Sequence, residues 1–247
     1  MAEREPDGPR LDDAFAGQGP VGGRSRLPPE ALSDLGSERS TPVEATVVVG
    51  DLRLSTYLLK ESVRPNLFAR FIVGFTEATR SLVQARDGWF DKFTGDGFIV
   101  FWIGEPDPPF LLETVPGFCQ EVRGAAGKLI DGLRRNSRNF PAGVGLSLGI
   151  DAGPCELVYV GGSLTLVGSP IVGATRMASS AGAGETLANV HIGGVLERDR
   201  DALSESRIGL ERVTARTKEY PEGQEAYRLR FPHSGDGGRP DDPARPT

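Results

Sequence analysis

The sequence is short of the residues and patterns that mark several protein classes. No apolar run approaches the ~20 residues that a membrane-spanning helix needs, and the polar N-terminus lacks the apolar core of a signal peptide. The only two cysteines of the 247 residues are Cys119 and Cys155. They could pair, but two thiols without a secretory signal are typical of reduced cytosolic proteins. The two histidines, His191 and His233, are isolated, and we assign them no metal-binding or catalytic role.

An excess of positive charge is also missing. The formal net charge is −6 and the sequence pI is about 5.1, so the chain has no overall basic surface for nucleic acid. An acidic protein that handles phosphates would need local cations or metal ions for that purpose. We therefore expect a cytoplasmic protein without a nucleic-acid or membrane partner.

Composition divides the chain into a body and two terminal segments. Hydrophobic residues make up 38% of the chain and charged residues 25%, which is ordinary for a globular protein. Residues 1–42, rich in Pro, Gly, Ser and charged side chains, are predicted to form a disordered arm, and residues 233–247 a disordered tail. The intervening residues 43–232 are enough for one substantial core.

Hydrophobic periodicity and turn residues predict the elements of this body. Helices are expected at residues 65–86, 111–135, 170–180 and 192–198. Strands are expected at residues 46–52, 144–151, 185–190, 207–213 and 225–231, with two short strands within 155–167 and a hairpin around the turn 91–97. The order β-α-β-β-α-β followed by extra strands and helices is that of a ferredoxin-like palm, an α+β fold. We expect a largely antiparallel sheet with its helices on one face.

Two carboxylates of these elements, Asp51 and Asp96, are candidate metal ligands. Three valines, 47–49, lead through Gly50 to Asp51 at the end of a buried strand, and Asp96 lies in the predicted hairpin turn. Alone, Asp51 is better explained as a helix N-cap or turn former, and the acidic turn as a solvated hairpin tip. If the strand and the hairpin are neighbours, however, the two carboxylates meet. A pair of Mg²⁺ or Mn²⁺ ions uses such an arrangement, with water and substrate phosphates as the other ligands.

Five separated segments together resemble the catalytic domain of class III nucleotide cyclases. The segments that carry the resemblance are residues 49–56 (VGDLRLST), 92–97 (KFTGDG), 148–154 (LGIDAGP), 167–177 (VGSPIVGATRM) and 217–218 (TK). They follow the family's order, cover roughly residues 46–231, and fall on the expected elements. The resemblance implies a homodimer joined head to tail, with two equivalent active sites that both subunits share.

The resemblance also implies a role for particular residues. Two divalent cations, Mn²⁺ or Mg²⁺, would be held by Asp51 and Asp96, with the carbonyl group of Leu52 as a backbone ligand. Arg176 would stabilise the charge that develops as the ribose 3′-hydroxyl attacks the α-phosphate. Lys218 would bind the terminal phosphates.

The remaining implied positions concern the base. Lys92 and Thr165 occupy the two positions that read the base in this family. The ribose-orienting Asn of the family is replaced by Val172, and its usual Gly-Phe pair by the residues 54–55 (Leu-Ser). Tyr57 follows shortly after, either as a wall of the base pocket or as an aromatic at a helix start. Large side chains beside the base would favour a smaller ring.

These departures resemble the pyrimidine cyclases of the Pycsar antiphage defence system. That resemblance implies that UTP, ahead of CTP, is converted to the 3′,5′-cyclic nucleotide and pyrophosphate, and that the product activates a separate effector protein. Two alternatives stay open. One is a bacterial adenylyl cyclase in which Lys92 and Thr165 read adenine; the other is an inactive nucleotide-binding regulatory domain, as the loss of the ribose-orienting Asn would suggest.

Overall fold

The computed structural model describes residues 40–62, 64–137, 139–160, 163–217 and 220–231. The first half of this region contains β1 (Thr41–Leu52), α3 (Ser55–Tyr57), a π-helical segment (Leu58–Ser62), α4 (Pro65–Gln84), β2 (Trp89–Phe93), β3 (Gly97–Ile103), a second π-helical segment (Phe110–Thr114) and α5 (Val115–Arg135). The second half contains β4 (Leu146–Val160), β5 (Ser163–Val167), α6 (Ser169–Ser180), β6 (Thr186–Asn189), α7 (Val190–Arg198), α8 (Arg200–Ser206), β7 (Gly209–Ala215) and β8 (Gln224–Arg230).

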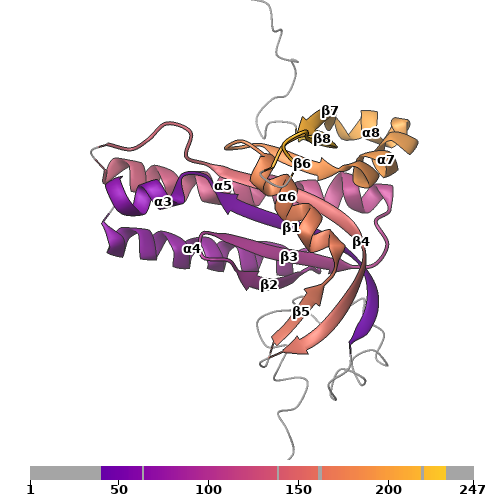
Figure 1. Cartoon of the computed structure of the whole chain (residues 1–247), viewed down its shortest axis with the longest axis horizontal. Helices are drawn as coiled ribbons and strands as arrows, with labels where there is room; N and C mark the ends of the chain where they lie inside the picture. Colours follow the sequence, from indigo (N-terminus) through magenta and orange to yellow (C-terminus); the bar gives the residue numbers. More distant parts are fainter. Residues whose placement is uncertain (1–39, 63, 138, 161–162, 218–219, 232–247) are drawn as a thin grey trace, which may run out of the picture.

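One mixed sheet organises the described residues, with β1 near its middle (Figure 1). The strand order is β2-β3-β1-β4-β6-β8-β7, and β5 pairs with β4 off this path. All pairs are antiparallel except β4 with β6. The predicted hairpin is therefore present as β2–β3, and it lies beside the first strand as expected. The α+β class is confirmed.

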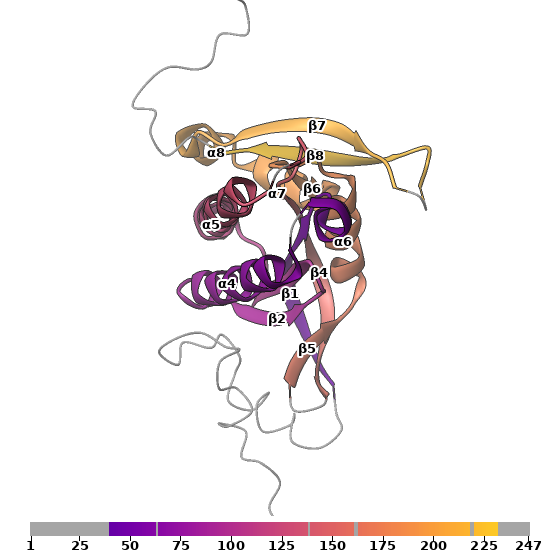
Figure 2. The ribbon, with the colours of Figure 1, turned by 90° about the vertical axis from the view of Figure 1, so that its left-hand side faces the viewer.

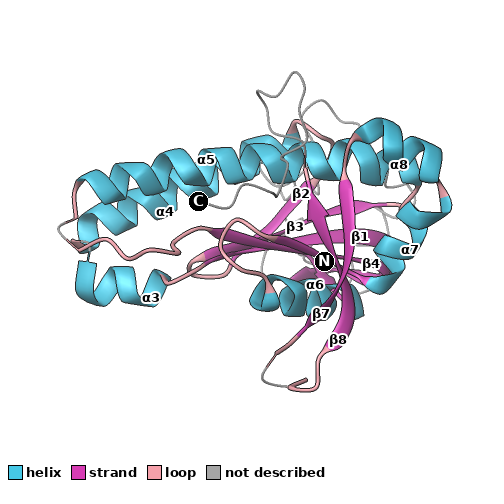
Figure 3. Ribbon diagram, turned by 90° about the horizontal axis from the view of Figure 1, so that it is seen from above, coloured by secondary structure: helices cyan, strands magenta, loops and turns pink. Residues whose placement is uncertain are grey.

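Helices cover both faces of the sheet, so the expectation that they lie on one face is wrong. The long helices α4 and α5 run side by side on one face, and α6 lies on the other (Figures 2 and 3). The valines of β1 explain why, since adjacent strand residues point to opposite faces. Val48 belongs to the core beneath α4 and α5, whereas Val47 and Val49 belong to the core beneath α6. A strand buried on both faces reads as a continuous apolar run.

The extents of two strands also differ from expectation, and one helix was not expected. β4 is one strand of 15 residues, not a strand to residue 151 followed by a separate short strand. It continues because its second half pairs with both the start of β1 and β5. β1 itself begins at Thr41, two residues before the predicted body, and the short helix α8 was not predicted. The arm to residue 39 and the tail from residue 232 lie outside the described residues.

Neither cysteine is in a disulfide, and no described helix is long and apolar enough to cross a membrane. Cys119 and Cys155 are both buried. Burial raises the pKa of the Cys119 thiol to about 12, so it stays protonated at neutral pH and behaves as a small apolar core residue.

A buried carboxylate joins four elements of the sheet and its helices. Asp151 of β4 is 3% exposed. It accepts hydrogen bonds from Nδ2 of Asn189 at the end of β6 (2.8 Å) and from Nε2 of His191 in α7 (3.0 Å). On the other side it packs against Gly173 of α6, where a Cβ atom would stand 1.7 Å from its Oδ2. The side chain thus fixes the position of α6, which carries Arg176, relative to the sheet.

The His191–Asp151 contact predicts a pH dependence of stability. The hydrogen bond to Asp151 raises the pKa of His191, and partial burial opposes it. Because the charged form is favoured by folding, this stabilisation is complete below the unfolded pKa of about 6.5 and is lost as the pH rises through the raised pKa. Urea denaturation between pH 5.5 and 8.5 should show the free energy of unfolding falling across this window in the wild type. In His191→Gln the fall should be smaller. Equal slopes in the two proteins would contradict the assignment.

Candidate active site

Asp51 and Asp96 lie together at one end of the sheet. Asp51 of β1 pairs with Gly97, the first residue of β3, and Asp96 directly precedes that glycine. The register therefore brings the two side chains to the same strand end, although they are 45 residues apart in sequence. Both line a pocket of about 550 Å³, whose other lining residues are Leu52, Arg53, Leu54, Ser55, Thr56, Tyr57 and Lys60.

Glycine at position 97 makes this approach possible. A Cβ atom there would stand 2.1 Å from the carbonyl oxygen of Gly50, so any larger residue would push β3 away from β1. The preceding Gly95 has φ +99°, a conformation that L-residues rarely adopt. Two glycines around Asp96 thus allow both the tight turn and the close strand pair that hold its carboxylate beside Asp51.

The electrostatics of the pocket fit a bound cation. The pKa of Asp51 is raised, first by burial and next by the negative charge of Asp96, while Arg53 opposes both effects. Two carboxylates that repel each other in a partly buried pocket are stabilised when a cation binds between them. Ser55 donates a hydrogen bond from Oγ to Oδ2 of Asp96 and so orients that carboxylate.

The donor set matches Mg²⁺ or Mn²⁺ better than zinc. Within the described part of the chain, no group of three or more His, Cys, Asp or Glu side chains is placed to hold a metal. Structural and catalytic zinc sites use three or four such protein ligands, whereas Mg²⁺ uses one or two carboxylates and completes its shell with water and phosphate. Leu52 can contribute only its backbone, because its side chain is 1% exposed and packs in the core.

Arg53 is a functional candidate that the sequence did not single out. Its Nη1 atom lies 3.4 Å from Oδ2 of Asp51. The same guanidinium donates to the carbonyl oxygens of Ala178, Ser179 and Ala181 at the C-terminal end of α6, with Nε 2.9 Å from the last of these. A cation is favoured at that end of a helix. Arg53 therefore holds the rim of the carboxylate pocket against α6. No local sequence pattern predicts this contact.

A second polar cluster lies apart from the pocket, where β2 approaches β5. Lys92 and Thr165 meet there, with Nζ of the lysine 2.9 Å from Oγ1 of the threonine. Neither residue lines the carboxylate pocket. The two positions that the sequence assigned to base reading are thus brought together from strands 73 residues apart.

Arg176 lies beside the turn between β7 and β8. Its guanidinium stacks over the ring of Tyr220, 4.7 Å from the centroid, and Ser180 of the same helix donates to the carbonyl oxygen of Arg216 (3.0 Å). Lys218 lies outside the described residues. Like the Lys92–Thr165 pair, Arg176 is absent from the lining of the carboxylate pocket.

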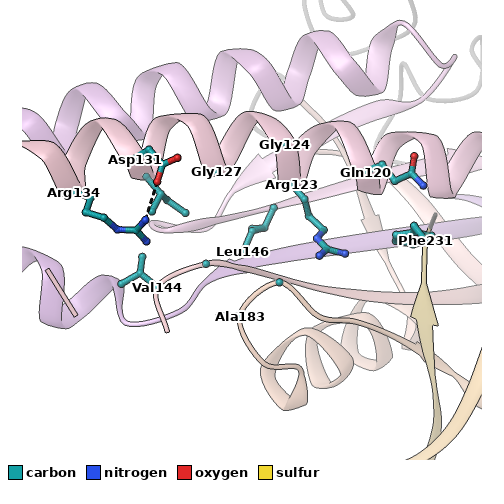
Figure 4. A pocket seen from close by; sticks show the side chains of 13 residues that line it. Gln120, Arg123, Gly124, Gly127, Asp131, Arg134, Val144, Leu146, Ala183 and Phe231 are labelled. Carbon is teal, nitrogen blue, oxygen red and sulfur yellow. Dashed lines mark hydrogen bonds and ion pairs between the residues drawn. The ribbon is translucent and has the colours of Figure 1, made fainter. Parts of the chain in front are cut away.

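Two further positions that the sequence singled out are accessible in the structure. Tyr57 is 45% exposed and lines the carboxylate pocket. Val172 is 48% exposed on α6, where it offers no hydrogen bond to a ribose. A further pocket of about 470 Å³ lies between α5 and the loop that contains Ala183, with Arg123 and Arg134 on its helix side (Figure 4). It contains none of the residues that the sequence predicted to be functional.

Comparison with solved structures identifies the fold. The adenylyl cyclase CyaB from P. aeruginosa is similar with a TM-score of 0.65 at 18% sequence identity, over 81% of this chain and 100% of that one. The chain has the fold of class III nucleotide cyclase catalytic domains. The guanylyl cyclase Cya2 is similar with a TM-score of 0.61 at 15% identity, over 80% of this chain and 97% of that chain.

Another similar structure with this cyclase fold is described as a dimer. It is the non-canonical dimeric guanylyl cyclase domain of the RhoGC fusion protein from the aquatic fungus Blastocladiella emersonii, with a TM-score of 0.51 at 14% identity, over 78% of this chain and 97% of that one. No protein-family model matches the sequence, and no curated protein matches it. The likeness is thus one of fold, carried by structure at low sequence identity.

The rim of the pocket contains one strained residue, Leu54. Its φ of 64° and ψ of 19° lie in the left-handed region, which costs a residue with a Cβ atom about 1–2 kcal/mol. Position 54 is where the cyclase pattern has glycine, which adopts this conformation without strain. The replacement of the family's glycine by Leu54 therefore destabilises the local backbone.

Replacing Leu54 by glycine should stabilise the protein. Relief of strain outweighs the extra entropy of an unfolded glycine, so Leu54→Gly should raise the free energy of unfolding by about 0.5–1 kcal/mol. Leu59→Gly is the matched control, because the two leucines are 46% and 45% exposed. Leu59 lies in a helical segment, where glycine should destabilise by about 1 kcal/mol. Chemical denaturation measures both, and equal losses in the two variants would contradict the role given to the left-handed backbone.

Proposed function

We propose that the protein is a metal-dependent nucleoside-triphosphate cyclase. The observation that carries the proposal is the pocket in which Asp51 and Asp96 converge from β1 and β3. In the reaction, the ribose 3′-oxygen forms a bond to the α-phosphorus while the bond from that phosphorus to the bridging oxygen of the β-phosphate breaks. Pyrophosphate leaves, and the hydroxyl proton passes to water. Such phosphoryl transfer depends mainly on positioning and charge stabilisation.

The chain's own residues supply the positioning. Asp51, Asp96 and the carbonyl group of Leu52 would hold two Mg²⁺ or Mn²⁺ ions, which supply Lewis-acid stabilisation of the phosphate oxygens when bound. Ser55 holds the carboxylate of Asp96 through its hydroxyl group. Arg53 balances the charge of Asp51 and keeps the loop after β1 against α6.

The second half of each site would come from a partner subunit. Lys92 and Thr165 would read the base, Arg176 would stabilise the transition-state charge, and Lys218 would bind the terminal phosphates. The separation within one chain supports this, because neither the Lys92–Thr165 pair nor Arg176 lines the carboxylate pocket. A head-to-tail homodimer would bring the two halves together twice, as closed two-fold symmetry requires.

We further propose that the substrate is a pyrimidine triphosphate, UTP ahead of CTP. Tyr57 is a large side chain on the wall of the carboxylate pocket, which favours a smaller base. Val172, exposed where the family has its ribose-orienting Asn, supports the resemblance to cyclases of antiphage defence. The cyclic product would then act as a second messenger on a separate effector protein.

Product analysis tests the reaction and the base together. Purified protein incubated with Mn²⁺ and each of the four NTPs should yield cyclic UMP as the main product by mass spectrometry. Asp51→Asn and Asp96→Asn should each lose at least roughly 100-fold of the rate, because a metal site supplies several kcal/mol. Asp131→Asn is the control; this exposed carboxylate is paired with Arg134, away from the pocket.

Each other outcome points to one alternative. Cyclic AMP as the dominant product would overturn the pyrimidine assignment and favour an adenylyl cyclase. Absence of product from every NTP would favour a regulatory domain. Full activity of Asp96→Asn would overturn the metal assignment.

Complementation tests the shared site. Asp51→Asn and Arg176→Ala should each be inactive alone, because each damages both sites of its homodimer. Mixed in equal amounts, they should recover about a quarter of the wild-type rate, since half of the randomly formed dimers are heterodimers with one intact site. If both variants are folded dimers and exchange subunits without any recovery, the shared site is wrong.

A further inference from the structure

The pocket between α5 and the loop that contains Ala183 has the size of a ligand site (Figure 4). Its volume of about 470 Å³ falls within the roughly 300–1,000 Å³ of small-molecule sites in proteins. One face of α5 forms one side, and the start of β4, with the apolar side chains of Val144 and Leu146, forms the other. This α5 pocket shares no lining residue with the carboxylate pocket.

Two helical glycines keep the α5 pocket open. Gly124 and Gly127 lie one turn apart on the face of α5 that lines it. A Cβ atom at either position would meet nothing within 4 Å, so close packing does not require glycine there. Glycine is less favourable than alanine in the interior of a helix. The helix thus gives up stability at the two positions where side chains would fill the pocket.

Arg123 brings a charge to this pocket without a counter-ion. Partial burial lowers the pKa of its guanidinium, and no carboxylate among the described residues opposes that effect. A partly buried cation without a partner is costly. Arg134, the other cation that lines the pocket, is already paired with Asp131 at 2.9 Å. The described lining residues therefore leave one positive charge uncompensated, at Arg123.

These features define the chemistry of a fitting ligand. A guanidinium binds a carboxylate or a phosphate group through two parallel hydrogen bonds. One uncompensated positive charge matches one negative charge, and the apolar side chains of Val144, Leu146 and Phe231 match an organic body. A nucleoside triphosphate carries several negative charges and matches poorly. A 3′,5′-cyclic nucleotide matches well, because its phosphodiester carries a single charge.

Both the β4 side of the α5 pocket and its loop are bonded to Arg53 of the carboxylate pocket. The carbonyl oxygen of Gly145 accepts a hydrogen bond from the backbone N–H of Arg53 (2.9 Å), and that of Ala181 accepts from its Nε (2.9 Å). Ala183 packs on Gly145, where an added Cβ atom would stand 3.0 Å from that of the alanine. A ligand between α5 and this loop therefore acts on the residue that contacts Asp51.

We propose that the α5 pocket is a regulatory site for a small organic anion of single charge, which Arg123 binds and Arg53 couples to the metal site. The binding is independent of the proposed reaction, whereas the coupling rests on the proposed function of the metal site. A bound anion would hold the loop and keep Arg53 beside Asp51, where its charge competes with a metal cation. The anion and Mn²⁺ should therefore weaken each other's binding by the same factor.

Calorimetric titration without metal ions tests the binding. The probes are cyclic UMP, cyclic AMP and the carboxylate orotate, with uridine as the uncharged control. At least one anion should bind, and uridine should bind at least about tenfold more weakly. Arg123→Met should weaken binding of the anion by a similar factor. Lys128→Met, which removes an exposed cation of α5 outside the pocket, should leave it unchanged.

The outcomes of this titration separate the possible ligands. Binding of a cyclic nucleotide alone would identify a phosphodiester as the ligand, and binding of orotate alone a carboxylate. If no anion binds, or if binding is equally strong in Arg123→Met, the site is wrong.

Filling the pocket gives a second test that leaves Arg123 in place. Gly127→Leu should abolish binding of the anion, because its side chain occupies the space that the glycine leaves open. Gly194→Leu is the matched control; it lies in α7, and a Cβ atom there also meets nothing within 4 Å. Thermal unfolding should show both variants at least as stable as the wild type, since leucine favours helices. Undiminished binding in folded Gly127→Leu would contradict the proposal.

The coupling is measured from initial rates at increasing Mn²⁺ concentration. A saturating anion should raise the Mn²⁺ concentration for half-maximal rate at least about fivefold in the wild type, and leave it unchanged in Arg123→Met. If the wild type forms no cyclic product from any NTP, the cyclase assignment fails, and the coupling is measured instead as Mn²⁺ affinity by electron paramagnetic resonance. An anion that binds through Arg123 without changing the Mn²⁺ dependence would overturn the regulatory role.

Discussion

The close pairing of β1 with β3 is the constraint on which the site depends. Asp51 and Asp96 repel each other and are partly buried, so a flexible chain would separate them. The register at Asp51 and Gly97, with no room for a side chain at the glycine, holds them at one strand end. Apolar residues of β1 buried on both faces of the sheet oppose any slip of that register. The cost of bringing two carboxylates together is thus offset by a core formed elsewhere.

Helix α6 links this pocket to the rest of the molecule. Near its first turns it packs on the buried carboxylate of Asp151 through Gly173. At its end, three carbonyl groups accept hydrogen bonds from Arg53, which also contacts Asp51. Between these two points the helix carries Arg176 toward the β7–β8 turn. One rigid element therefore fixes the distance between the carboxylates and the arginine of the same chain.

Local patterns in the sequence predicted where helices and strands occur better than they predicted which distant residues each element contacts. The helix α4 and the β2–β3 hairpin follow from periodicity and turn residues; α4 ends two residues and β2 three residues from expectation. The continuity of β4 and the face on which α6 packs depend on partners far away in the sequence. Asp91 shows the same limit: it was predicted in a turn, but pairing with β3 makes it a buried bulge residue. Arg53 was missed because the carbonyl groups that it binds lie 125 residues or more away.

The charges that line the carboxylate pocket support the proposal that one chain is only half of a site. A triphosphate and two metal ions need cationic side chains around the phosphates. Among the described residues, the cations of this pocket are Arg53 and Lys60, and Arg53 is bound to Asp51 and to three helix carbonyl groups. Turning it toward a phosphate would release the end of α6. Arg176, the described residue proposed to stabilise the charge on the phosphates, lies outside the pocket; in the proposed homodimer, a second copy of the chain would bring it there.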